Sequence, residues 1–89
     1  MHVKKLILDV LKPHQPDVVE FACHLAAKQT RLKVGVRVVE MDEKTDSIEV
    51  VIEGGNIDMN SILEAISEMG ASLHSIDGVE VLNSGDESE

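Results

Sequence analysis

The stretch RLKVGVRVVEMDEKTDSIEVVIEGG, residues 31–55, decides the fold of this chain. Apolar residues alternate with polar or small ones on both sides of an acidic segment, residues 42–46. A two-residue period is typical of a half-buried β-strand, and five residues are enough for a hairpin loop. The stretch therefore predicts a β-hairpin whose apolar side chains point to one layer: Leu32, Val34, Val36, Val38, Ile48, Val50 and Ile52.

The segment before the hairpin predicts a strand and then a helix. Residues 3–11 are rich in Val, Ile and Leu and apolar on nearly both faces, which is typical of a central strand with Leu6, Leu8 and Val10 in the core. Two prolines hold the connection, residues 12–16, extended. Asp17 then begins a helix, in which Cys23 is expected as a core thiol. The helix buries Val18, Phe21, Ala22, Leu25 and Ala26.

The segment after the hairpin repeats this order. A helix begins near Asp58 and ends at Gly70, which we expect in the left-handed conformation that glycine adopts without strain. Its inward side chains are Met59, Ile62, Leu63, Ile66 and Met69. A last strand covers residues 71–82, and its period slips at Asp77-Gly78, which predicts a β-bulge.

The element order is βαββαβ with short connections. Right-handed βαβ crossovers place both helices on one face of the sheet. The sequence therefore predicts an α+β, ferredoxin-like sandwich: a four-stranded antiparallel sheet with two helices on one face and the first and third strands central. Residues 1–82 form this single domain, and residues 83–89, NSGDESE, are expected to be a disordered acidic tail.

Composition excludes several classes of partner. The 89 residues carry a net charge of -9 and contain no Trp, no Tyr and one Phe. Nucleic acids bind through Lys and Arg on phosphates and through aromatic stacking, so neither nucleic acid nor an anionic membrane is an expected partner. The N-terminus lacks a signal-peptide pattern and no apolar run is long enough to span a membrane, so we expect a cytoplasmic protein.

The sheet face away from the helices carries more aliphatic residues than a wetted surface needs. The second strand is in addition an edge strand, which offers free backbone groups to another chain. We therefore expect the protein to form homo-oligomers through this face, this edge or both. The candidate interface residues are Ile7, Leu11, Arg37, Val39 and Val51.

Polar residues are expected to converge where the first strand ends beside the start of the fourth. Imidazoles and carboxylates at one rim could bind a divalent cation such as Ca²⁺ or Mg²⁺, and the lysine with the helix start could bind an anion or another small ligand. Alternatively, these residues cap backbone groups or lie at a subunit contact. The candidates are Lys12, His14, Glu40, Asp42, His74 and Asp77.

Three segments resemble DUF211, a small archaeal family of unknown function: LDVLKPH at residues 8–14, VVEMDEKTDSIEVVIEG at 38–54 and SLHSIDGV at 72–79. The resemblance implies a ferredoxin-like fold, an archaeal cytoplasmic source and homo-oligomers, ring-like or of another form. It implies no activity and no functional residue.

Three functions remain open from the sequence. We favour a non-enzymatic, homo-oligomeric binding or regulatory module with no certain cofactor. The alternative is an adaptor that presents its open sheet face or acidic rim to a basic protein. A small enzyme is the least favoured, because the chain has no nucleophile elbow, phosphate loop or paired carboxylates in a cleft.

Overall fold

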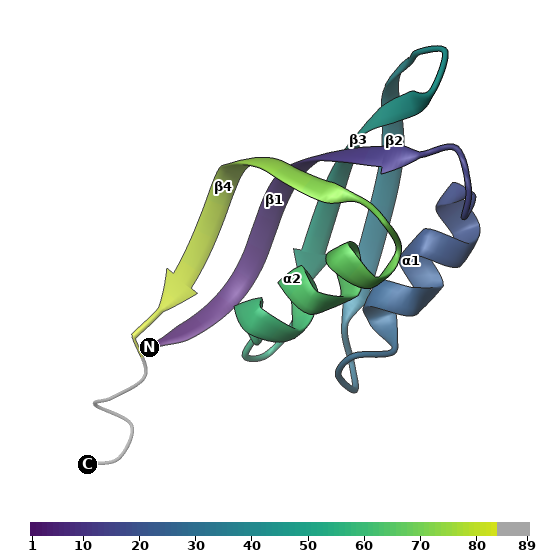
Figure 1. Cartoon of the computed structure of the whole chain (residues 1–89). Helices are drawn as coiled ribbons and strands as arrows, with labels where there is room; N and C mark the ends of the chain where they lie inside the picture. The colour runs from purple at the N-terminus through teal and green to yellow at the C-terminus, as the bar shows by residue number, and fades with distance from the viewer. Residues whose placement is uncertain (84–89) are drawn as a thin grey trace.

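A computed structural model describes residues 1–83, which form a four-stranded sheet with two helices on one face (Figure 1). The elements are β1 (His2–Pro13), α1 (Val18–Ala26), β2 (Lys33–Met41), β3 (Thr45–Glu53), α2 (Met59–Glu68) and β4 (Ser72–Leu82). The strand order is β2-β3-β1-β4, and every neighbouring pair is antiparallel. The predicted ferredoxin-like fold with β1 and β3 at its centre is confirmed. The predicted tail, apart from Asn83, lies outside the described residues.

The core lies between the helices and the two central strands. The register of β1 and β3 pairs Leu6 with Ile52 and Leu8 with Val50. Residues directly opposite in an antiparallel pair share a face, so the two alternating patterns add up to one apolar layer. The helices close that layer with Phe21, Leu25, Ile62, Ala65 and Ile66, all buried.

Helix α1 begins where the sequence predicts, but its cysteine does not enter the core. The Oδ1 atom of Asp17 accepts a hydrogen bond from the backbone N–H of Glu20 at 2.9 Å, which caps the helix. Phe21 is buried, whereas Cys23 is exposed. Two residues along a helix correspond to a rotation of about 200°, so the two side chains point in nearly opposite directions. The expectation of a core thiol was wrong for this reason.

Helix α2 confirms the predicted glycine stop and corrects one core residue. Gly70 has φ +76°, the left-handed conformation expected of it. Asp58 caps the other end by accepting from the N–H of Asn60 at 3.1 Å. Leu63, predicted to point inward, is 36% exposed, and Ala65 is buried instead.

Strand β4 contains the predicted bulge and a second one. Ile7 pairs with Gly78 and Leu8 with Ile76, which leaves Asp77 unmatched as expected. A second shift, between the partners of Asp9 and Val10, leaves His74 unmatched. Bulges of this kind increase strand twist and re-aim side chains. In Figure 1, β4 runs past the side of α2, outside the cover of the helix.

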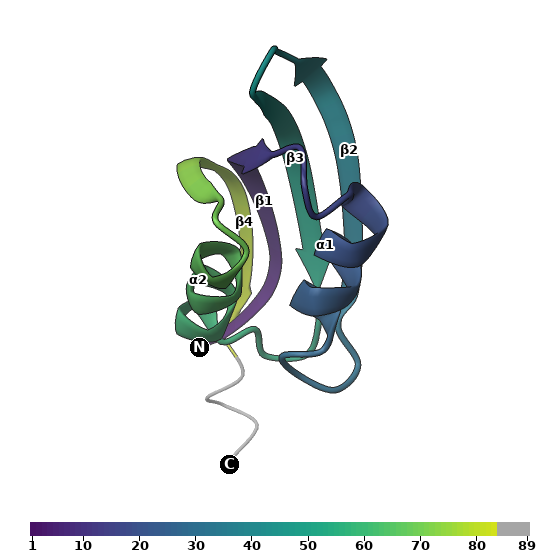
Figure 2. The same cartoon turned by 45° about the vertical axis from the view of Figure 1, so that its right-hand side comes forward.

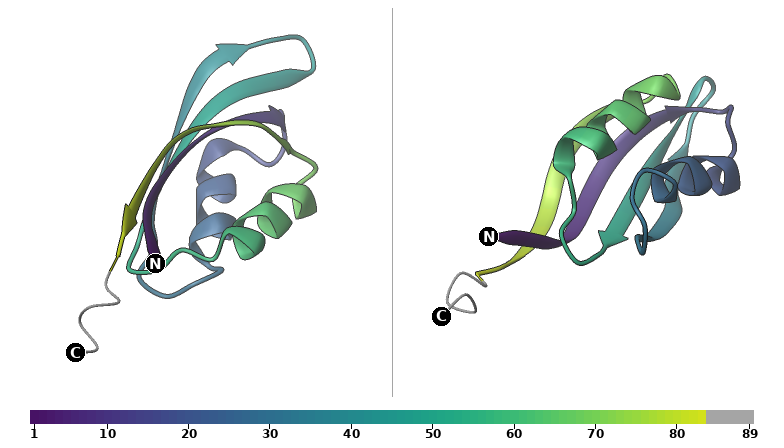
Figure 3. Two further views of the ribbon diagram at one scale, coloured as in Figure 1. Left: turned by 90° about the vertical axis from the view of Figure 1, so that its left-hand side faces the viewer. Right: turned by 90° about the horizontal axis from the view of Figure 1, so that it is seen from below.

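The β2–β3 hairpin extends beyond the end of α1, as Figures 1 and 2 show from two directions. The two views in Figure 3 show that both helices remain on one side of the curved sheet. Within residues 1–83, neither helix has the length and apolar character that a membrane crossing requires.

Candidate functional site

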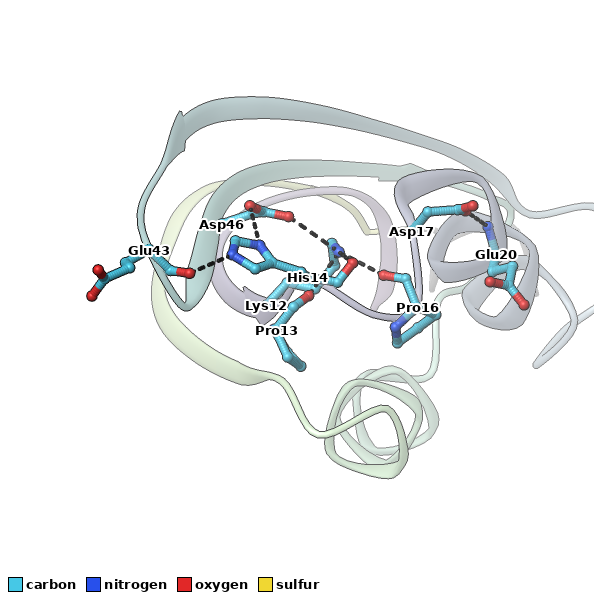
Figure 4. A network of polar contacts seen from close by, with 8 residues as sticks. All are labelled: Lys12, Pro13, His14, Pro16, Asp17, Glu20, Glu43 and Asp46. Carbon is cyan, nitrogen blue, oxygen red and sulfur yellow. Dashed lines mark hydrogen bonds and ion pairs between the residues drawn. The ribbon is translucent and has the colours of Figure 1, made fainter.

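The most enclosed polar group of the described chain is Lys12. Lys12 continues the inward alternation of Leu6, Leu8 and Val10 on β1, so its side chain enters the helix side of the sheet and is only 1% exposed. An ammonium group buried without partners would be strongly destabilising. Its Nζ atom donates to the carbonyl oxygens of Pro13 at 2.8 Å, His14 at 3.3 Å and Pro16 at 2.5 Å (Figure 4). All three N–H donors of the lysine are therefore used to hold the β1–α1 connection, in which the Gln15–Pro16 peptide bond is cis.

Asp46 supplies the negative charge of this network. Its Oδ2 atom lies 3.3 Å from Nζ of Lys12, and its side chain is 7% exposed. The register of β1 and β3 places Lys12 directly opposite Asp46, so the ion pair is a cross-strand pair on the buried face. The sequence reasoning missed Asp46. The signal was present, because Asp46 lies two residues before Ile48 in the inward alternation of the same strand.

His14 connects this ion pair to the tip of the hairpin. Its Nδ1 lies 3.0 Å from Oδ1 of Asp46, and its Nε2 lies 2.9 Å from the carbonyl oxygen of Glu43. A carbonyl oxygen only accepts, so Nε2–H is the donor there, and Nδ1 faces a carboxylate that is an acceptor when ionised. Only the imidazolium form carries a proton on both nitrogens. Figure 4 shows the ring between the two oxygen atoms.

The protonated form of His14 is favoured by these contacts. The hydrogen bond to the Glu43 carbonyl is the largest cause that raises the pKa of His14 above 6.5. The Asp46 carboxylate raises the pKa as well, whereas partial burial and the nearby Lys12 ammonium lower it. The net direction is upward, so the imidazolium persists to higher pH than that of an unperturbed histidine.

The remaining candidates of the predicted rim do not join this network. His74 lies at the second bulge of β4 with its Nδ1 3.1 Å from Oδ2 of Asp9, on the open sheet face. Asp77 accepts a hydrogen bond from Ser75 Oγ at 2.7 Å. Glu40 is exposed near the end of β2. The structure therefore brings Lys12, His14 and Asp42 to one place and leaves the other three apart.

A hollow of about 380 Å³ lies beside the network, between the hairpin and the start of α1. Its lining includes the network residues, three apolar side chains and two further acids: Lys12, His14, Asp17, Val18, Val38, Met41, Asp42 and Asp46. Within residues 1–83, no three His, Cys, Asp or Glu side chains are arranged to hold a metal ion. A Ca²⁺ or Mg²⁺ site at this rim stays a prediction.

The predicted interface residues on the open sheet face differ in their exposure. Leu11 is 40% and Val39 58% exposed. Ile7 and Val51 are half-buried, and the position of a Cβ on Gly78 would lie 3.1 Å from Cδ1 of Ile7. This means that Ile7 packs against the neighbouring strand more than it faces water.

Ion pairs also cross this face. Arg37 contacts Glu49 at 3.2 Å, and His74 contacts Asp9 at 3.1 Å. Such pairs reduce the apolar area that the open face can offer to another protein.

The topology and the ion-pair network define the class of protein: a small α+β domain of the ferredoxin-like fold with a buried lysine on the helix side of its sheet. The chain belongs to the family DUF211, described as "Uncharacterized ArCR", which matches residues 4–85. It is also 38% identical over 77 residues to the uncharacterized protein MJ0319 of Methanocaldococcus jannaschii, an alignment that covers 86% of this chain and 79% of the relative.

Proposed function

We propose that this protein is a non-enzymatic subunit of a homo-oligomer that serves as a binding or regulatory module. The observation that carries the proposal is the uncovered apolar surface of β4. Ile76, Val79 and Val81 are 53%, 56% and 52% exposed. Ile76 and Val79 lie opposite the buried Leu8 and Leu6 of β1, so they are on the face that helices cover elsewhere in the sheet.

Uncovered aliphatic side chains of this kind favour association. Burial of apolar surface stabilises a complex by roughly 25 cal/mol for each Å² removed from water. A small domain buries a smaller fraction of its own surface than a large one, so a second copy adds the cover that one chain cannot provide. Contiguous apolar patches on small proteins are typical of interaction sites.

The polar network supports a structural and not a catalytic role. The three Lys12 donors and both His14 nitrogens have oxygen partners, so neither residue offers a free nucleophile or general base. Binding of a small ligand or a divalent cation would then occur beside this network or between subunits.

The test is the mass of the native protein measured by light scattering after size exclusion, from low to high micromolar concentration. We expect a mass several times 9.7 kDa. A single-chain mass at every concentration would refute the proposal. Thermal-shift screens with Ca²⁺, Mg²⁺ and common metabolites, repeated on His14→Ala and His74→Ala, test for ligands, because a ligand of the native state raises its stability.

An adaptor for a basic protein partner is the second candidate. The exposed Leu11 and Val39 on the open sheet face, together with the net charge of -9, favour it. A monomer that gains no mass with concentration, but binds a basic peptide in a salt-dependent manner, would support the adaptor over the oligomer.

A further inference from the structure

The two edges of the sheet carry opposite charge. β2 and β4 each pair on one side only among the described strands, so both have free backbone groups. Lys33 and Arg37 are exposed on β2, whereas Asp77 and Glu80 are exposed on β4. Three of these charged side chains lie on the open sheet face, because their strand partners do. Lys33 pairs with Glu53, Arg37 with Glu49 and Glu80 with Lys5. A basic edge and an acidic edge on the same face are complementary.

The helix layer is apolar at both of its ends. His24 of α1 contacts Glu68 of α2 at 2.8 Å, so this side of α1 faces the other helix. Val19, 68% exposed, lies on the part of α1 turned away from α2. On α2, Leu63 is 36% exposed and lies about 140° around the helix from Glu68, on the flank away from α1.

From these two observations, and resting on the proposed self-assembly, we propose that the β2 edge and outer flank of α1 in one copy dock against the β4 edge of the next copy. The occupant of each edge is thus a second copy of this chain. β2 runs antiparallel to β3 and therefore parallel to β1, whereas β4 runs antiparallel to β1. β2 and β4 of adjacent copies can accordingly pair in the antiparallel sense, with all helices on the same side of one continuous sheet.

One register satisfies both the charges and the apolar side chains. When Lys33 lies opposite Glu80 of the next copy, Val34 lies opposite Val79. The bulge at Asp77 then places Val36 opposite Ile76 and Arg37 opposite Ser75, as the same bulge places Leu8 and Asp9 between β1 and β4. The unmatched Asp77 lies diagonally across from Arg37 in this register. Val34 and Val36 are on the helix side of the sheet, packed against the core. In this register the helix side of β2 therefore continues into the helix side of β4, and the open face of β2 into the open face of β4.

The docked surfaces differ from each other, so the contact is heterologous. Heterologous contacts close into rings when the rotation between copies allows, and otherwise continue as chains. In both cases each copy uses β2 once and β4 once. This property separates the proposal from a symmetric dimer, in which one edge would meet its own equivalent.

Charge reversal tests the contact directly. The β2 variant is Lys33→Glu with Arg37→Glu, and the β4 variant is Asp77→Lys with Glu80→Lys. Each alone should reduce the mass of the oligomer toward that of one chain. An equimolar mixture should regain the oligomer with the two variants alternating, because one variant is then acidic at both edges and the other is basic at both edges. Each variant repels its own copies but attracts the other variant at both contacts. A chain that carries all four changes should regain the parental mass.

Matched controls reverse charges away from both edges. Lys44→Glu at the hairpin tip and Glu64→Lys on α2 are exposed, and both should leave the mass unchanged. Circular dichroism of every variant checks the fold.

The outcomes are separable. A monomeric parent refutes both this contact and the proposed homo-oligomer. An oligomeric parent that resists either folded variant refutes only the contact, and loss of assembly in one variant alone indicates a symmetric interface through that edge. A four-change chain that fails to reassemble also contradicts the proposed pairing.

Discussion

Replacement of the Asp46 carboxylate by a neutral amide tests how much the buried ion pair with Lys12 stabilises the fold. Asp46→Asn keeps the size of the side chain but leaves the Lys12 ammonium, 1% exposed, without its counter-charge at 3.3 Å. Breaking a buried ion pair on one side typically costs about 3 to 5 kcal/mol. Three carbonyl oxygens still accept hydrogen bonds from Nζ of Lys12, so we expect the low end, about 3 kcal/mol.

The assay is urea unfolding at a fixed subunit concentration, because self-association makes the midpoint depend on concentration. Lys12→Met and the double variant with Asp46→Asn complete a double-mutant cycle. We expect the double variant to be more stable than the sum of the single losses predicts, by about 1 to 3 kcal/mol, because it no longer buries an unpaired charge. A loss below about 1 kcal/mol for Asp46→Asn, or a coupling near zero, would show that the buried pair does not organise this end of the domain.

Three further predictions follow from single residues. The pKa of His14 is raised in the folded state, so the stability that its imidazolium contributes is complete below pH 6.5 and is lost as the pH rises through the folded-state pKa. In melting curves from pH 6 to 9, His14→Gln should remove this pH dependence. The pKa of Glu68 is lowered, first of all by the hydrogen bond from His24, so the melting temperatures of the parent and Glu68→Gln should converge as the pH falls through and below 4.5. Gly70→Ala should lower the free energy of unfolding by about 1 kcal/mol, because φ of Gly70 is +76°. Gly55→Ala is the control and should be near neutral, because no atom lies within 4 Å of the new Cβ. Equal losses of stability in the two variants would contradict the strain at Gly70.

Much of the fold could be predicted because it depends on local patterns. Alternation on β1 and β3 identified the inward residues, and Asp17 and Gly70 marked helix ends by their effect on the backbone at their own positions. The bulge at Asp77 was visible as a break in the period. The exposure of Cys23 also follows from helix geometry, because its position lies about 200° around the helix from that of the buried Phe21.

The site could be predicted only in part, because its contacts join segments distant in the chain. Lys12 and His14 were recognised as polar residues at one end of the sheet, but their shared partner, Asp46, lies more than thirty residues away. His74 was expected beside His14, and the second bulge instead leaves it on the open face with Asp9. A shift of one residue moves a strand side chain to the opposite face, and no local pattern reported this shift.

By itself the sequence determined the order of elements, the inward and outward faces of the strands, and the acidic character of the surface, since each depends on neighbouring residues or on composition. The tertiary structure alone decided which charges meet and which apolar residues stay uncovered. Strand register turned Lys12 and Asp46 into a buried pair, and the placement of α2 left Ile76 and Val79 exposed on β4. The physical reason is that pairing and cover depend on distances between segments that only the folded sheet brings together.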